Sequence, residues 1–141
     1  MKRQDKLKWY RGEFEEISNK IHSKSFLSYY DFLRIRNFKL QNTTTENEEH
    51  IKSVSEEAFK LAKQDKIQEA ISCLIQLDGV AIPIASTILA MKFPNKFVII
   101  DRRVITAIGK KEWLKKYLID PSIYESYLKL LRQKAKDEGV D

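Results

Sequence analysis

The stretch that decides the fold is residues 71–108, ISCLIQLDGVAIPIASTILAMKFPNKFVIIDRRVITAI. Apolar residues recur at helical spacing on both sides of Gly79, which predicts two helices, at about 66–77 and 83–92, joined by a tight hairpin. Glycine permits a backbone conformation in such a turn that a side chain would forbid. The backbone N–H groups beside the second helix's start would form an anion site suited to a phosphate.

The apolar run FVII at 97–100 follows this helix pair. It has the composition of a strand, but the chain contains no second β-like run to pair with it, so we expect buried extended chain. Asp101 comes directly after the run. We expect its carboxylate to cap a helix of about 102–109, because Asp accepts hydrogen bonds from the free N–H groups of a first helical turn.

The rest of the chain also has helical periodicity, and its 4 Gly and 3 Pro are too few for the turns of a sandwich or barrel. Further helices are predicted at about 5–22, 28–39, 46–63, 111–118 and 121–136. Thr45 followed by Glu48 is a capping-box pattern for the third of these five. The stripe expected to be buried on the first consists of Leu7, Tyr10, Phe14, Ile17 and Ile21. The predicted fold class is all-α: one compact helical domain over residues 1–141, with room for two small lobes and a cleft.

Composition excludes several classes of protein. With 43% hydrophobic and 33% charged residues in 141, the chain can pack a core and is not disordered. One cysteine excludes a disulfide framework and a cysteine zinc site, and His22 and His50 lack metal-ligand spacing, so no metal or cofactor is expected. No apolar run approaches the ~18 residues of a membrane span, and the basic N-terminus lacks a signal-peptide core. We expect a cytoplasmic protein without a membrane partner.

Charge is unevenly distributed along the chain. Residues 1–40 hold ten basic and five acidic side chains, residues 41–70 four and seven, and residues 71–141 twelve and eight. Two basic segments around an acidic one suit a basic face toward a polyanion, although a solvated lysine-rich surface explains the same pattern. The candidate phosphate ligands are Arg102, Arg103, Lys110 and Lys111, which with Lys115 and Lys116 could equally form ion pairs or a solvated face.

The hairpin and the aspartate after it resemble the helix-hairpin-helix DNA glycosylase superfamily. That family has a Leu-x-Gly-Val-Gly hairpin, an Ala a few residues later, and an aspartate after an apolar run. The matching residues here are Leu77, Gly79, Val80, Ala85 and Asp101. The resemblance covers about 38 of the 141 residues. Residues 33–39 and the Ala58-Phe59 pair are similar, more loosely, to a group of small bacterial relatives.

The resemblance implies a DNA repair protein with a cleft. Its hairpin residues Gly79, Val80 and Ala81 would bind a phosphate of duplex DNA, and a nucleotide would be flipped into the cleft. Asp101 would be catalytic, since a carboxylate stabilises the positive charge that builds on the sugar when an N-glycosidic bond breaks, or activates the water. The implied activity is a DNA N-glycosylase, a hydrolase of base excision repair.

The chain departs from the family pattern at several positions. Ala81 replaces the family's second hairpin glycine, and Asp78 adds a negative charge beside the expected phosphate. Pro83 stands where strand-cleaving members carry a Schiff-base lysine, so only base removal would remain. Cys73 is the single cysteine, which excludes the iron–sulfur cluster of some relatives.

Two functions therefore remain open on the sequence alone. One is a monofunctional DNA N-glycosylase acting through Asp101; the other is a non-catalytic DNA-binding or protein-interaction module in which Asp101 only caps its helix. Aromatic residues that could stack on a flipped base, or simply pack in the core, are Trp9, Tyr10, Tyr29 and Tyr30. A carboxylate facing an open cleft beside the hairpin would favour the enzyme.

Overall fold

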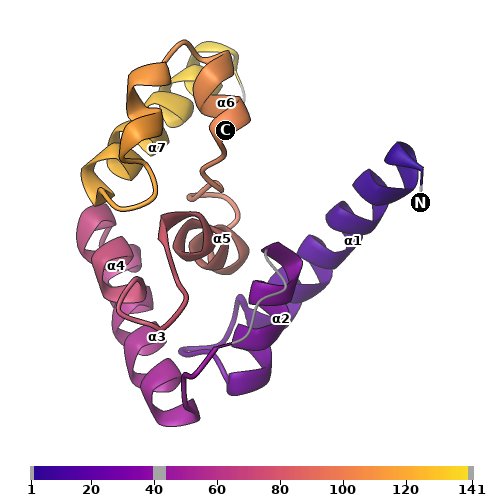
Figure 1. Cartoon of the computed structure of the whole chain (residues 1–141), viewed down its shortest axis with the longest axis vertical. Helices are drawn as coiled ribbons and strands as arrows, with labels where there is room; N and C mark the ends of the chain where they lie inside the picture. Colours follow the sequence, from indigo (N-terminus) through magenta and orange to yellow (C-terminus); the bar gives the residue numbers. More distant parts are fainter. Residues whose placement is uncertain (1, 40–43, 140–141) are drawn as a thin grey trace.

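A computed structural model describes residues 2–39 and 44–139. Within them all regular secondary structure is helical, which confirms the predicted all-α class (Figure 1). The elements in chain order are α1 (Arg3–Ile21), α2 (Tyr29–Lys39), α3 (Glu48–Lys63), α4 (Ile67–Leu74), α5 (Ile82–Lys92), α6 (Arg102–Ala107), the 3₁₀-helix η1 (Lys111–Lys115) and α7 (Pro121–Asp137).

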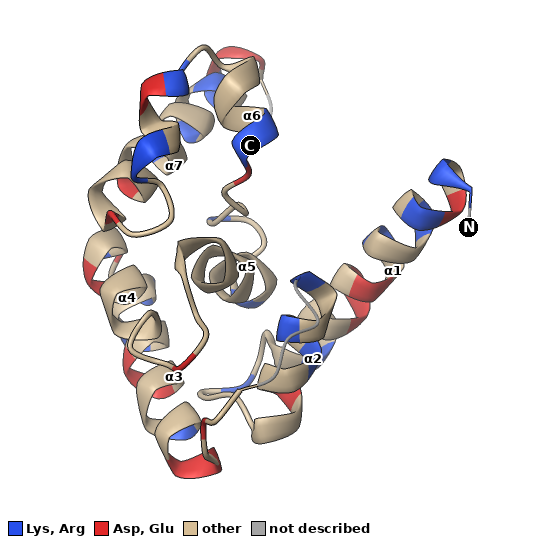
Figure 2. Cartoon of the chain, in the orientation of Figure 1, with Lys and Arg blue, Asp and Glu red and all other residues tan. Residues whose placement is uncertain are grey.

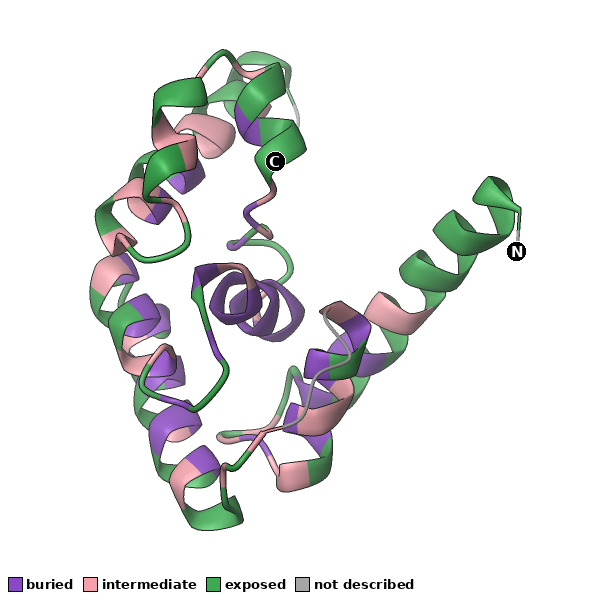
Figure 3. Ribbon diagram, in the orientation of Figure 1, coloured by how far each residue is buried: buried purple, intermediate pink, exposed green. Residues whose placement is uncertain are grey.

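Helix α5 lies in the middle of the molecule, and the other helices surround it (Figures 1 and 3). Every residue of α5 except Pro83 is buried. A helix that is apolar on all sides needs neighbours on all sides, and α5 contacts α1, α2 and α4. The hydroxyls of Ser86 and Thr87 both donate to the carbonyl of Pro83 at 2.8 Å, so these buried polar groups are satisfied within the helix.

Helices α3 and α7 are amphipathic, and the charged residues lie almost entirely outside α5, whose own charged residue is Lys92 (Figure 2). Helix α3 packs on α4, and α4 packs on α7. The buried apolar side chains form a single cluster to which all seven α-helices contribute. Among the described residues, one core therefore joins all of these helices.

The first half of α1 is not part of that core. Ile17 and Ile21 are buried as predicted, but Leu7 is 56% and Tyr10 44% exposed. The expectation of a fully buried stripe was wrong because α1 has 19 residues and α2, which packs against it, has 11. The N-terminal half of α1 therefore extends past the body of the molecule (Figures 1 and 3).

Two helix ends differ from their predicted positions. The cap of α3 is Asn47, whose side chain accepts from the N–H of His50 at 3.0 Å, so the capping box of Thr45 and Glu48 was wrong. Thr45 instead donates to the Asp78 carboxylate through its N–H (2.9 Å) and its hydroxyl (2.8 Å). Helix α4 ends at Leu74, three residues earlier than expected, although it contacts α5 as predicted.

Candidate functional site

The extended chain at 97–100 leads directly to the candidate site. Tyr124 donates its hydroxyl hydrogen bond to the carbonyl of Val98 at 2.8 Å, and Tyr127 donates to that of Ile99 at 3.0 Å. Burial raises the pKa of Tyr127 to about 12 and also raises that of Tyr124. Side chains from α7 thus take the place of the neighbouring strand that the sequence lacks. Residues 97–100 lie outside any helix or strand, as predicted, but only Phe97 and Ile100 are buried, and Val98 is exposed, so the expectation of a fully buried run was wrong.

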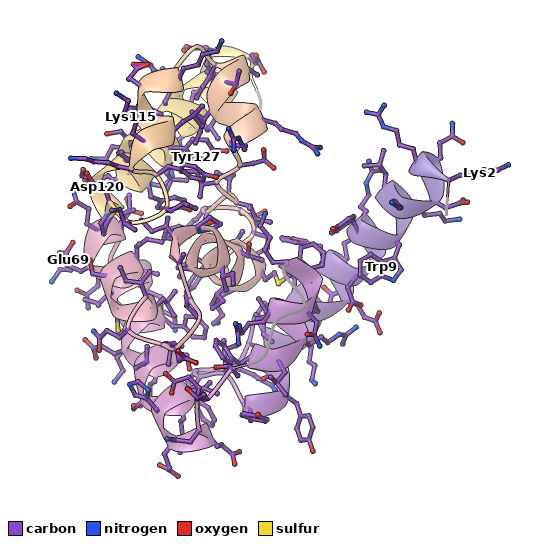
Figure 4. All side chains as sticks on the ribbon, in the orientation of Figure 1. Lys2, Trp9, Glu69, Lys115, Asp120 and Tyr127 are labelled. Atoms are coloured by element: carbon purple, nitrogen blue, oxygen red, sulfur yellow. The ribbon has the colours of Figure 1, made fainter. Side chains whose placement is uncertain are left out.

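Helix α5 holds the other side of this segment. The Ser86 hydroxyl accepts a hydrogen bond from the N–H of Ile100 at 3.0 Å, and Ile100 is buried. The extended segment is therefore held from both α5 and α7 immediately before Asp101. Figure 4 labels Tyr127 on the inner side of α7. The hydrogen bonds to residues 98–100 therefore fix the backbone that leads to Asp101.

Asp101 caps α6, as predicted. Its Oδ1 accepts a hydrogen bond from the N–H of Arg103 at 2.6 Å. None of the residues that the structure describes donates a hydrogen bond to its other oxygen, Oδ2. Asp101 also lines a cleft, so its Oδ2 atom is available to a molecule bound there while Oδ1 caps the helix.

The cleft has a volume of about 750 Å³ and lies between the first two helices and the α5–α6–η1 part of the chain. That volume is in the range of pockets that hold a small molecule or a nucleoside. Its apolar wall includes Leu7, Tyr10, Phe38, Ile84, Ile99 and Tyr117. Its charged lining consists of Lys39, Asp101, Arg102 and Arg103. The site thus combines apolar and aromatic walls with three cations and one carboxylate.

Lys39 is a residue of this site that the sequence did not reveal. Burial lowers its pKa, and the nearby carboxylate of Asp101 acts in the opposite direction. Among the described residues Lys39 forms no ion pair within 4 Å, so a gap separates its ammonium from Asp101. Lys39 ends the 33–39 stretch singled out above, but no sequence pattern places it opposite a residue 62 positions later.

The hairpin contributes backbone donors at the start of α5. Ala81 and Pro83 line the cleft, whereas Gly79 and Val80 do not. No described residue accepts a hydrogen bond from the N–H of Ala81 or Ile84, whereas that of Ile82 donates to Leu118 O at 3.2 Å. Ala81 has φ −98°, which any residue adopts, so alanine in place of glycine at this position causes no backbone strain.

The turn itself is built around Gly79, which has φ +76°, as expected for glycine in such a turn. The Asp78 carboxylate points to Thr45 rather than to the cleft, and it does not line the cleft. Hydrogen bonds from the N–H and hydroxyl of Thr45 lower the pKa of Asp78. Asp78 is therefore a link between the hairpin and the start of α3.

The candidate phosphate ligands separate into two groups. Arg102 and Arg103 line the cleft and are exposed. Lys110 and Lys111 do not line it, and the Lys110 ammonium lies 5.7 Å from the ring centroid of Trp113. Instead of the α-helix expected at 111–118, the structure has the 3₁₀-helix η1, whose turn of about 120° per residue places Lys111 and Lys115 on different sides. Figure 4 draws Lys115 across the molecule from Trp9.

Of the four candidate stacking aromatics, only Tyr10 lines the cleft. Trp9 lies next to it on α1, with the two ring centroids 5.3 Å apart. Tyr29 and Tyr30 are at the start of α2, away from the cleft lining.

Nothing in the described ranges groups three or more potential metal ligands. His50 lies 2.6 Å from a carboxylate oxygen of Glu46, and Cys73 is partly buried with its thiol 3.4 Å from the carbonyl of Val54. None of the helices that the structure describes has the length and apolarity to cross a membrane. No protein-family model, curated protein or solved structure matches this chain.

Proposed function

We propose that this chain is a DNA-binding protein of the base-excision type, a monofunctional DNA N-glycosylase that receives a flipped nucleotide in the cleft beside Asp101. The observation that carries the proposal is the position of Asp101: the residue singled out by the sequence pattern lines a cleft of about 750 Å³ with one carboxylate oxygen uncommitted. A cleft of this size could hold other ligands, and the resemblance to the helix-hairpin-helix glycosylases is the reason for proposing DNA.

The lining of the cleft supports a nucleotide as its occupant. Tyr10 and Tyr117 offer aromatic surface to a base, and a base removed from its stack is read by stacking and shape. Arg102 and Arg103 are available to the phosphates on either side of that nucleotide. The N–H groups of Ala81 and Ile84 add uncommitted donors at the positive end of the α5 dipole.

Asp101 would act on the bond between the sugar and the base. As that bond lengthens, its electrons leave with the base and positive charge develops on the sugar. A carboxylate beside the sugar stabilises this charge more than it stabilises the neutral ground state, and it can take a proton from the attacking water. The water oxygen bonds to the sugar carbon that the base leaves, so the products are an abasic sugar bearing that hydroxyl and the free base, which keeps the electrons of the broken bond and gains the other proton of the water.

A non-catalytic module on the same scaffold is the alternative, and one observation favours it. The Oδ1 atom of Asp101 already has a structural task, the cap of α6 at 2.6 Å from the N–H of Arg103. In that case the cleft and the arginines would bind DNA or a protein partner without chemistry. Duplex binding without base release would identify this function.

The test is a base-release assay over a panel of duplexes that each contain one damaged or modified base. We expect release by the native chain and its loss in Asp101→Asn, which keeps the cap because Asn also caps helices well. Asp120→Asn is a matched control: Asp120 caps α7 by accepting from the N–H of Ser122 at 2.9 Å and does not line the cleft. Equal base release by the native chain and Asp101→Asn would reject the catalytic role of Asp101. Equal loss of release in Asp101→Asn and Asp120→Asn would indicate an effect on folding.

A further inference from the structure

The N-terminal end of α1 forms a surface that begins at the rim of the cleft and continues away from it, which we call the α1 arm (residues 2–12). It extends from the body of the molecule, with Lys2 at its tip and Trp9 farther along (Figure 4). Three large apolar side chains on it are exposed: Leu7, Tyr10 and Trp9, the last to 48%. Exposed apolar groups gathered in four consecutive residues indicate a binding surface.

The rings of the α1 arm are held in place before any partner arrives. The ring of Trp9 stacks on that of Phe38 at 6.4 Å and 20°, and Tyr10 meets the same Phe38 edge-on at 5.1 Å. Phe38 is itself buried, so it anchors both rings to α2. A half-exposed indole that is already fixed loses little conformational entropy when something stacks on it.

The charge of the α1 arm favours a negatively charged partner. Residues 2–12 carry one acidic side chain, Asp5, and five basic ones, Lys2, Arg3, Lys6, Lys8 and Arg11. The net charge of +4 favours a polyanion and opposes pairing with the same arm of a second copy. The apolar set is also small for a helix that embeds in a lipid interface, where a broad apolar face is needed.

The α1 arm is continuous with the cleft, because Leu7 and Tyr10 belong to both. We propose that the α1 arm binds a single-stranded or locally unpaired segment of nucleic acid, with Trp9 stacked on an unpaired base and the basic side chains on the phosphates. Aromatic platforms within basic surfaces bind unpaired strands in this way, without sequence preference. The choice of nucleic acid as the partner rests on the proposed function, but binding of the strand to the α1 arm can be measured without base release.

The experiment uses the tryptophan fluorescence of the full chain. The chain has two tryptophans, so Trp113→Phe leaves Trp9 as the single reporter. We expect an oligothymidylate to quench this fluorescence, and an oligomer of the same length with abasic sugars to bind without comparable quenching. Should Trp113→Phe fail to fold, the quenching lost from the native chain on Trp9→Phe reports the same contact.

Affinity measurements separate stacking from charge. We expect Trp9→Ala to weaken oligothymidylate binding by about tenfold, in the range measured for one stacked base, and to change binding of the abasic oligomer less than twofold. Tyr30→Ala is the matched control, because Tyr30 is an exposed aromatic residue outside the α1 arm, and we expect it to change neither. Arg11→Gln and Lys8→Gln together should weaken both.

Three results would overturn the inference: equal quenching by both oligomers, tighter binding to anionic lipid vesicles than to oligothymidylate, or a dimer that Trp9→Ala dissociates. The Asp101→Asn variant should quench like the native chain. Quenching without base release would therefore reject the glycosylase alone, and base release without quenching would reject the α1 arm alone.

Discussion

The guanidinium of Arg36 lies directly against Gly79: a Cβ added to that glycine would stand 2.4 Å from Arg36 Nη2. Arg36 is fully buried, packs over the ring of Phe32 at 5.7 Å, and donates from Nη2 to the Gly79 carbonyl at 3.5 Å. The hairpin therefore requires glycine for two reasons, its φ of +76° and this close approach. Through this contact α2 supports the turn that precedes α5.

Replacing Gly79 with alanine should destabilise the fold by more than backbone strain alone. Gly109 also has φ +76°, but nothing lies within 4 Å of its added Cβ, so Gly109→Ala reports the strain without the steric clash. We expect Gly109→Ala to cost about 1 kcal/mol and Gly79→Ala at least about 1 kcal/mol more. Urea unfolding of both variants measures this, and equal costs would mean that Arg36 moves aside freely.

Stability should fall with pH above about 10 because of the two α7 tyrosines. The unfolded chain releases the phenolic proton of Tyr127 near pH 10, whereas the native chain holds it to about 12. The native state then binds more protons than the unfolded state, so stability decreases as pH rises, by up to about 1.4 kcal/mol per pH unit for each such group. Tyr127→Phe should weaken this slope; an unchanged slope between pH 10 and 11.5 would contradict the assignment.

Duplex affinity should fall steeply with salt, because each phosphate contact releases counterions. Arg102 and Arg103 line the cleft, so Arg102→Gln and Arg103→Gln should each reduce the log–log slope by about one unit. Lys110 and Lys111 lie outside the cleft lining, and glutamine at both should reduce it less. Titrations of duplex DNA at four salt concentrations measure these slopes. A larger reduction of the slope by the lysine pair than by the arginine variants would contradict the prediction and indicate that the DNA passes over η1.

Lys39→Met tests whether a charge is held in the cleft at a cost to stability. Burial lowers the pKa of Lys39, which means that its charged form is disfavoured by its surroundings. We expect Lys39→Met to leave the free energy of unfolding unchanged or higher and to weaken duplex binding. A loss of stability beyond about 1 kcal/mol in thermal and urea unfolding would show that Lys39 has a structural partner in the fold.

Local rules were sufficient for much of this structure. Apolar spacing predicted the positions of the α-helices, because burying one face of a helix constrains residues three and four apart. The roles of Gly79 and Asp101 were predicted from their own backbone neighbours: a turn needs positive φ, and a first helical turn needs an acceptor. The absence of a partner for residues 97–100 likewise predicted extended chain.

Tertiary structure alone decided how these parts form a site. The sequence by itself determined that helices form, where the turn lies and which aspartate begins α6. It did not determine that Lys39 lies near Asp101, that Arg36 supports Gly79, or that the α1 arm stays exposed. Each depends on contacts between segments far apart in the chain, whose free energy is set by packing and burial rather than by sequence spacing.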